Sequence, residues 1–130
     1  SDSVGFSGED FLNMVISFYS DHEPLHIAMQ LKSIETDHDR VRTKDKFSSR
    51  TLDLDLLLYD QQVIATETLT IPHNDILKYA FVLEPLAEIA PDQQHPVTNV
   101  CYQQLWQAFD KRIAAQQKIE HLPGIKSLAK

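Results

Sequence analysis

The chain has 130 residues, a length typical of one compact domain with its own core. Apolar residues make up 42% and charged residues 24%, which excludes a disordered or collagen-like chain. The formal net charge of −7 argues against a general binder of nucleic acid or of membrane surfaces. Cys101 is the only cysteine, so the chain forms no internal disulfide, and we predict a reducing, cytoplasmic location.

The first third of the chain predicts a loop, a strand and a helix. Residues 1–10 are polar and contain two glycines, which is typical of a loop. Residues 11–19 are rich in β-branched and aromatic side chains, which predicts a strand. Pro24 suits the first turn of a helix, and apolar residues follow it at three-residue spacing. We therefore predict a helix over 24–37.

The segment 40–50 departs from the acidic average of the chain. It holds five basic residues and one acidic residue, a local charge of +4 that leaves −11 on the rest. A charge run by itself is usually a solvated loop. Arginine and lysine are also the side chains that bind phosphate, and this run comes directly before a strand that carries carboxylates. The combination indicates a small anionic ligand, such as a phosphate chain.

Residues 51–59 (TLDLDLLLY) form the clearest predicted strand, and they carry two carboxylates. Alternation places Leu52, Leu54, Leu56 and Leu58 on one face, and it places Asp53 and Asp55 on the other. The two carboxylates are then roughly 6.5–7 Å apart along the strand, and they repel each other unless a cation lies between them. A solvated strand surface is the alternative, but Asp is depleted in strands. Oxygen ligands of this kind suit Mg²⁺.

The remainder of the chain predicts short elements. Residues 60–64 predict a turn that leads into a hairpin, and residues 70–73 predict a short edge strand that ends at proline. Residues 74–90 predict two short helices, and residues 101–111 place apolar side chains on one helical face. The polar residues 112–130 predict a tail.

Two histidine patterns are candidates for further sites. His22 and His26 have the spacing of a helical metal pair, but they straddle Pro24 and have no obvious third ligand, so a zinc site is not favoured. His73 follows Pro72, and a lone histidine is usually structural. The sequence has no glycine-rich P-loop or dinucleotide-binding motif.

Three runs of sequence together resemble the 6-hydroxymethyl-7,8-dihydropterin pyrophosphokinase family. They are FSSRTLDLDLLLY at 47–59, IPH at 71–73 and FVLEPLAEIAP at 81–91. The resemblance extends from about residue 4 to about residue 110. It implies an α+β fold of ferredoxin-like type, with a central antiparallel sheet flanked by helices. The family begins with a strand and a helix that this chain does not contain, so the resemblance implies a single, N-terminally incomplete domain over 1–130.

The resemblance also implies an activity and a set of phosphate and metal ligands. The family moves pyrophosphate from ATP to the hydroxymethyl group of 6-hydroxymethyl-7,8-dihydropterin and leaves AMP, a step of folate biosynthesis. By matched position, Asp53 and Asp55 would hold two Mg²⁺ ions. Arg40, Arg42 and Arg50 would bind and neutralise the phosphates, and these five residues form the expected catalytic set. His73 would contact the nucleotide.

For the pterin, the resemblance implies a polar contact and aromatic stacking. Asn13 would read the edge of the ring, and Phe11 and Phe81 would stack on its two faces. Phe47 is placed with the pterin-binding residues as well. The expected partners are therefore small molecules, ATP and the dihydropterin, with no nucleic acid and no membrane.

Three departures from the family pattern leave a second interpretation open. At the positions of Phe47 and Ser49 the family usually has Trp and Pro, and at the position of Tyr79 it often has Arg. These changes, with the missing front, favour a paralogue or fragment that binds pterin or nucleotide without turnover, or an interaction module. A two-metal phosphoesterase is a third interpretation that rests on the carboxylate pair alone. It explains less of the basic segment and of the aromatic residues.

Overall fold

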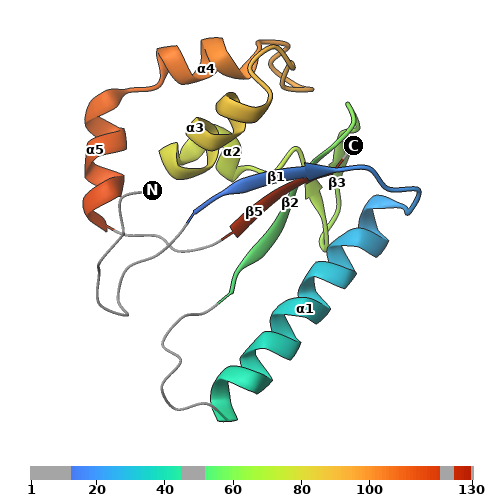
Figure 1. Cartoon of the computed structure of the whole chain (residues 1–130). Coiled ribbons are helices and arrows are strands. Elements are labelled where there is room, and N and C mark those ends of the chain that lie inside the picture. Colours follow the sequence, from blue (N-terminus) through green and yellow to red (C-terminus); the bar gives the residue numbers. More distant parts are fainter. Residues whose placement is uncertain (1–12, 45–51, 121–124, 130) are drawn as a thin grey trace.

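The structure, a computed structural model, describes residues 13–44, 52–120 and 125–129. The described elements form an α+β arrangement in which helices lie on both faces of a small sheet (Figure 1). Helix α1 (Pro24–Lys44) lies along one face, and helices α2 (Asp75–Lys78), α3 (Ala80–Ile89) and α4 (Tyr102–Ala108) lie on the other (Figure 1). The coarse fold class predicted from the sequence is therefore confirmed.

The main sheet has the strand order β1-β5-β2, with β1 at Val15–Phe18, β5 at Ile125–Ala129 and β2 at Leu54–Tyr59. Strand β5 runs parallel to both neighbours, so the antiparallel pairing expected for the central sheet is not what these three strands form. Strands β1 and β2 run in the same direction because a long crossover containing α1 joins them. Antiparallel pairing occurs between β3 (Ile64–Ala65) and β4 (Thr70–Ile71).

The prediction of a polar tail over 112–130 was wrong. Helix α5 spans Lys111–Glu120, and β5 follows at Ile125–Ala129 as the central strand of the sheet. The sequence of α5, KRIAAQQKIE, consists largely of good helix formers, although it has no strong apolar stripe. The strand is too short to be recognised without its partners, because its pairing spans most of the chain length.

Helix α1 is longer than the predicted span 24–37. The segment 38–44 (HDRVRTK) contains no glycine or proline, and its straight-chain charged residues favour continued helix. The basic segment 40–50 therefore begins inside α1, and its residues 45–50 lie outside the described part of the chain.

Strand β2 is the best anchored strand of the sheet. Leu56, Leu57, Leu58 and Tyr59 are all buried, so both faces are covered at its C-terminal end. The predicted turn follows it: Asp60 has φ of 50°, and the N–H of Gln62 donates to the carbonyl of Tyr59 at 3.0 Å. The predicted hairpin does not form, because β3 pairs with β4 and not with β2.

Two apolar clusters lie on the two sides of the sheet. The larger one contains Leu57 and Leu58 of β2 together with side chains of α2, α3 and α4. The smaller one contains Ile27 of α1 with Leu56, Tyr59 and Ile71. The two helices predicted over 74–90 and the helix predicted over 101–111 appear as α2, α3 and α4 and are confirmed. Among the described residues, none of the helices is long and apolar enough to cross a membrane.

Candidate active site

The structure brings Asp55 of β2 beside His73, which lies well downstream in the sequence. The backbone N–H of His73 donates to the carbonyl of Leu57 at 2.9 Å, which fixes the segment after Pro72 along β2. The imidazole Nε2 of His73 then lies 3.9 Å from Oδ2 of Asp55. Each of these two side chains is 27% exposed, so the pair lies at the surface but is partly shielded from water.

Asp75 joins this pair as a third polar side chain. Its Oδ2 lies 3.8 Å from Nδ1 of His73, and its backbone N–H donates to the same Nδ1 at 3.1 Å. Because Nδ1 accepts that hydrogen bond, neutral His73 carries its proton on Nε2, the nitrogen that faces Asp55. The sequence reasoning missed Asp75, whose signal is its place two residues after His73 at the start of α2.

One oxygen or nitrogen from each of Asp55, His73 and Asp75 lies within 4.8 Å of the other two. Among the described residues, these three side chains are the ones close enough together to share a metal ion. His22 and His26 are not part of the group. The rings of that histidine pair lie 4.5 Å apart. Asp53 is not part of the group of three either. The carboxylates of Asp55 and Asp75 supply oxygen ligands of the kind that Mg²⁺ prefers, so the donors brought together here fit this ion.

Asp53 lies immediately before β2 and is exposed, whereas Asp55 lies inside the strand and is half-buried. Between them, the backbone N–H of Leu54 donates to Oε2 of Glu35 on α1. The carboxylate of Glu35 is 13% exposed and also lies 3.7 Å from the ammonium of Lys32. Glu35 therefore holds the point of the chain that carries both aspartates, a role that no sequence pattern indicated.

The predicted phosphate-binding arginines are described only in part. Arg40 lies on α1, where its Nη2 pairs with Oδ1 of Asp37 at 2.6 Å. Both side chains of that pair are more than 60% exposed, so water screens the interaction and an anionic ligand can replace Asp37 at small cost. Arg42 belongs to α1, but its side chain lies outside the described part, as does the whole of Arg50.

Of the predicted pterin-binding residues, the structure describes Asn13 and Phe81. Asn13 has a buried Oδ1 that meets no hydrogen-bond donor among the described residues. Phe81 is half-buried against the larger apolar cluster, and its ring stacks on Tyr79 with centroids 5.0 Å apart and planes 28° apart. Phe11 and Phe47 lie outside the described residues.

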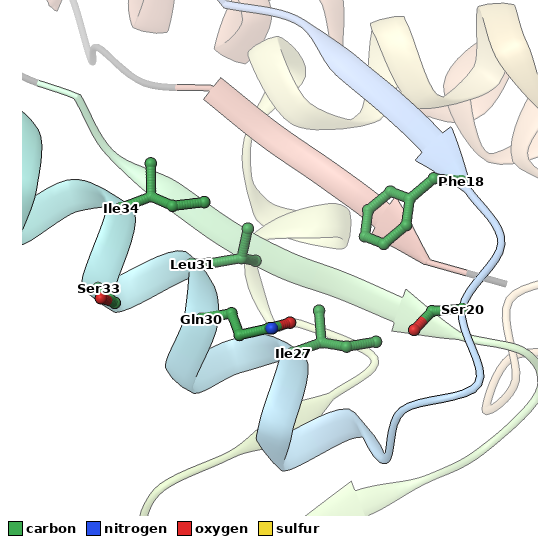
Figure 2. A pocket seen from close by; sticks show the side chains of 7 residues that line it. All are labelled: Phe18, Ser20, Ile27, Gln30, Leu31, Ser33 and Ile34. Atoms are coloured by element: carbon green, nitrogen blue, oxygen red, sulfur yellow. The ribbon is translucent and has the colours of Figure 1, made fainter.

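A separate apolar pocket of about 450 Å³ opens between β1 and α1. Figure 2 shows Phe18, the last residue of β1, and Ser20, in the segment that follows the strand, on the side of the pocket opposite Ile27 and Leu31 of α1. The remaining lining residues are Gln30, Ser33 and Ile34. None of the seven belongs to the predicted site, so the pocket is a feature of the α1 side of the sheet and not of the carboxylate group.

Two buried polar groups lie away from the carboxylates. Burial lowers the pKa of His95, whose Nδ1 accepts hydrogen bonds from the N–H groups of Val97 and Thr98. Burial raises the pKa of Tyr102 well above its usual range, and the hydroxyl of Tyr102 meets no partner among the described residues. Both groups therefore stay uncharged at neutral pH, and they serve the fold of the α4 region.

Comparison with known proteins gives a family and several relatives. The family model described as 7,8-dihydro-6-hydroxymethylpterin-pyrophosphokinase (HPPK) matches residues 1–91. The chain is 38% identical over 104 residues to the Haemophilus influenzae protein named 2-amino-4-hydroxy-6-hydroxymethyldihydropteridine pyrophosphokinase, which covers 80% of this chain and 64% of that protein.

A protein of the same name from Pseudomonas aeruginosa is 38% identical over 97 residues, covering 74% of this chain and 59% of that protein. The folic acid synthesis protein fol1 of Schizosaccharomyces pombe is 39% identical over 101 residues, which is 78% of this chain and 13% of that protein. The chain thus spans roughly three fifths of the length of the two bacterial relatives.

Proposed function

Because this chain belongs to the 7,8-dihydro-6-hydroxymethylpterin-pyrophosphokinase family, we propose that it transfers pyrophosphate from ATP to the hydroxymethyl group of 6-hydroxymethyl-7,8-dihydropterin. The products are AMP and the diphosphorylated pterin, in the folate pathway. The names of the bacterial relatives support this reaction, and so does the identity of 38% over about three quarters or more of the chain.

The observation that carries the proposal is the contact between Asp55 and His73. The family resemblance assigns a metal to the first residue and a nucleotide to the second, and the fold brings the two within 3.9 Å. Neutral His73 has its proton on Nε2, so it can donate a hydrogen bond to an anionic oxygen held beside Asp55. A phosphate chain bridging a cation and an imidazole N–H fits this arrangement.

Mg²⁺ is the ion we propose for Asp53 and Asp55, in two copies. When bound, such ions neutralise charge on the phosphate oxygens of ATP. The contribution of this chain is to hold both carboxylates at fixed positions: β2 anchors Asp55 through its buried leucines, and Glu35 fixes the backbone at Leu54.

Arg40, Arg42 and Arg50 are proposed to bind the phosphate oxygens. The pair that Arg40 forms with Asp37 is exposed, and such pairs contribute about 0–1 kcal/mol, so exchange for a phosphate oxygen is easily offset. Arginine also makes two parallel hydrogen bonds to a phosphate, which lysine cannot match.

The pterin is proposed to bind between Asn13 and Phe81. A pterin edge carries ring N–H and amino groups, and the buried Oδ1 of Asn13 is an acceptor that meets no donor among the described residues. Supplying a donor there would satisfy a group whose isolation costs about 1–3 kcal/mol. Phe81 offers an aromatic surface for stacking, with Phe11 proposed for the opposite face and Phe47 nearby.

The chemical step then needs positioning and charge neutralisation more than covalent help from the protein. The hydroxymethyl oxygen of the pterin attacks the β-phosphorus of ATP and releases its proton to solvent water. The new oxygen–phosphorus bond forms as the bond from the β-phosphorus to the oxygen of the α-phosphate breaks, and AMP leaves. The arginines and the N–H of His73 stabilise the charge that develops on the phosphate oxygens.

We also propose four further features of the protein. They are a ferredoxin-like arrangement, a single domain over 1–130, a cytoplasmic location, and partners restricted to ATP and the dihydropterin. The single Cys101 is compatible with a reducing compartment.

The direct test is product formation by the chain as it stands. The chain is incubated with ATP, Mg²⁺ and the dihydropterin, and AMP and the diphosphorylated pterin are quantified chromatographically. We expect the two products in equal amounts, with neither formed when the pterin is omitted. Micromolar pterin binding without AMP would contradict the proposal and identify a binding protein instead.

A further inference from the structure

Helices α2 and α3 meet at a one-residue junction that leaves two backbone groups without helical partners. Tyr79 is extended there, with φ of −122° and ψ of 128°, and it interrupts the helical hydrogen-bond ladder. The N–H of Ala80 opens α3 and the carbonyl of Lys78 closes α2, positions at which helices lack internal partners. Ala80 is buried, so water cannot easily replace a missing partner.

A single side chain of α5 supplies both partners. The Oε1 of Gln117 accepts the N–H of Ala80 at 2.8 Å, and its Nε2 donates to the carbonyl of Lys78 at 2.8 Å. One carboxamide thus bridges the two sides of Tyr79 as a neighbouring strand would. Because 37 positions separate Gln117 from Ala80, this contact ties α5 to the α2–α3 junction.

The residues on either side of Ala80 form an aromatic pair. The rings of Tyr79 and Phe81 stack with centroids 5.0 Å apart, and the ammonium of Lys78 lies 5.4 Å from the centroid of the Tyr79 ring. The direction of both rings depends on the backbone between Lys78 and Phe81. That backbone is the part of the chain that Gln117 holds.

We propose that Gln117 is a positioning residue that fixes the Lys78–Ala80 backbone and thereby sets the Tyr79–Phe81 aromatic pair against which the pterin stacks. The pterin part of this inference rests on the proposed function. The contact itself does not, because α5 lies beyond the residues 1–91 that the family model matches.

The test compares Gln117→Leu with Gln117→Glu, and Gln116→Leu is the matched control because Gln116 is the exposed neighbour on the same helix. The leucine variant retains the approximate size of the Gln117 side chain and removes both hydrogen bonds. The glutamate variant keeps the acceptor for Ala80 and removes the donor to Lys78. Thermal unfolding of each variant establishes that it folds.

Ligand affinities are the first measurement, with dihydropterin and a non-hydrolysable ATP analogue titrated separately. We expect Gln117→Leu to raise the Kd for the pterin about five- to tenfold, which corresponds to the net free energy of roughly one hydrogen bond. The Kd for the nucleotide should change less than about twofold, and Gln116→Leu should change neither. An equal loss for both ligands, or no loss for the pterin, would overturn the positioning role.

Amide hydrogen exchange at Ala80 is the second measurement, and it does not depend on any ligand. We expect exchange to accelerate at least about tenfold in Gln117→Leu and to stay near the original rate in Gln117→Glu, since only the first variant lacks the acceptor. Unchanged protection in Gln117→Leu would show that α5 does not hold the junction. If the original chain binds no pterin, the proposed function and the pterin part both fail, while the exchange data still decide the contact.

Discussion

The two sides of the central sheet differ in how completely they are covered. On the side of α2, α3 and α4, Leu57, Val82, Leu83 and Leu86 are at most 1% exposed. On the side of α1, Met29 is 63% exposed and Ile34 is 50% exposed, and a pocket of about 450 Å³ opens beside β1. The α3 side holds more fully buried apolar side chains, whereas the apolar pocket opens on the α1 side. Exposed apolar residues such as Leu77 on α2 and Met29 on α1 occur on both sides.

This difference bears on which side of the sheet supports each residue of the proposed site. Phe81 packs against the larger apolar cluster, and the backbone N–H of His73 donates to the carbonyl of Leu57, a member of that cluster. Arg40 lies on α1, on the other side of the sheet. We infer that the α3 side positions Phe81 of the proposed pterin site, whereas Glu35 on α1 helps to hold the backbone that carries the proposed carboxylates.

The largest expected effect is on the free energy of unfolding when one apolar side chain is shortened on each side of the sheet. Leu83→Ala removes a fully buried side chain and should destabilise the fold by about 2–5 kcal/mol. Ile34→Ala, on α1, should cost about 1 kcal/mol or less, because half of that side chain is already in water. Urea unfolding of both variants measures the difference. Equal losses would mean that the α1 side is covered in solution.

The next effect concerns the contact between α1 and β2. Glu35→Leu leaves the N–H of Leu54 without its acceptor and should cost about 1–3 kcal/mol. Glu35→Gln keeps an acceptor oxygen and should cost less than half as much. Denaturant unfolding together with amide exchange at Leu54 measures both, and rapid exchange at Leu54 in the original chain would refute the contact.

Stability should also fall in mild acid through His95. Burial lowers its pKa in the folded chain from 6.5, so the unfolded chain binds the proton more readily. Its contribution is complete above about pH 6.5 and declines as the pH falls toward the lowered value, at no more than about 1.4 kcal/mol per pH unit for one proton. His95→Asn keeps an acceptor for Val97 and Thr98 and should flatten this part of the Tm–pH profile. A profile with the same slope would show that other groups dominate.

The smallest expected effect is that of Tyr102→Phe, which should not lower the free energy of unfolding. The hydroxyl of Tyr102 is buried and meets no partner among the described residues. Tyr102→Phe removes that hydroxyl and should leave stability unchanged or raise it by up to about 1 kcal/mol. Thermal unfolding measures it, and a clear loss of stability would mean that the hydroxyl has a partner such as a bound water.

Local sequence patterns predicted the elements that depend on local interactions. The leucine run of β2, the proline-bounded β4 and the apolar spacing of α3 are all visible within a dozen residues. Strand β5 was missed because IKSLA becomes a strand only by pairing with β1 and β2, both of which lie far away in the chain. The extension of α1 over residues 38–44 was missed because this segment is mostly charged and carries no apolar periodicity to mark it as helix.

The candidate site divides in the same way. Asp53 and Asp55 are visible as an unusual pair in an apolar strand, and His73 follows from the family pattern. Asp75, Glu35 and Gln117 act through contacts that span between 2 and 39 residues, and neither Glu35 nor Gln117 has a sequence signature of its own. Their roles depend on which backbone groups the fold leaves without partners, and periodicity does not report that.

The proposed pyrophosphate transfer is tested most directly by AMP release from the chain and from two aspartate variants. Asp55→Asn keeps the shape of the side chain and removes the charge proposed to hold Mg²⁺, and Asp92→Asn removes an exposed charge outside the site. With saturating ATP, Mg²⁺ and dihydropterin, we expect Asp55→Asn to lower the rate of AMP formation at least about 100-fold, or about 2.7 kcal/mol in the barrier. Asp92→Asn should retain the original rate. AMP formation by Asp55→Asn at a rate close to that of Asp92→Asn would contradict the assignment of the carboxylates and the account built on it.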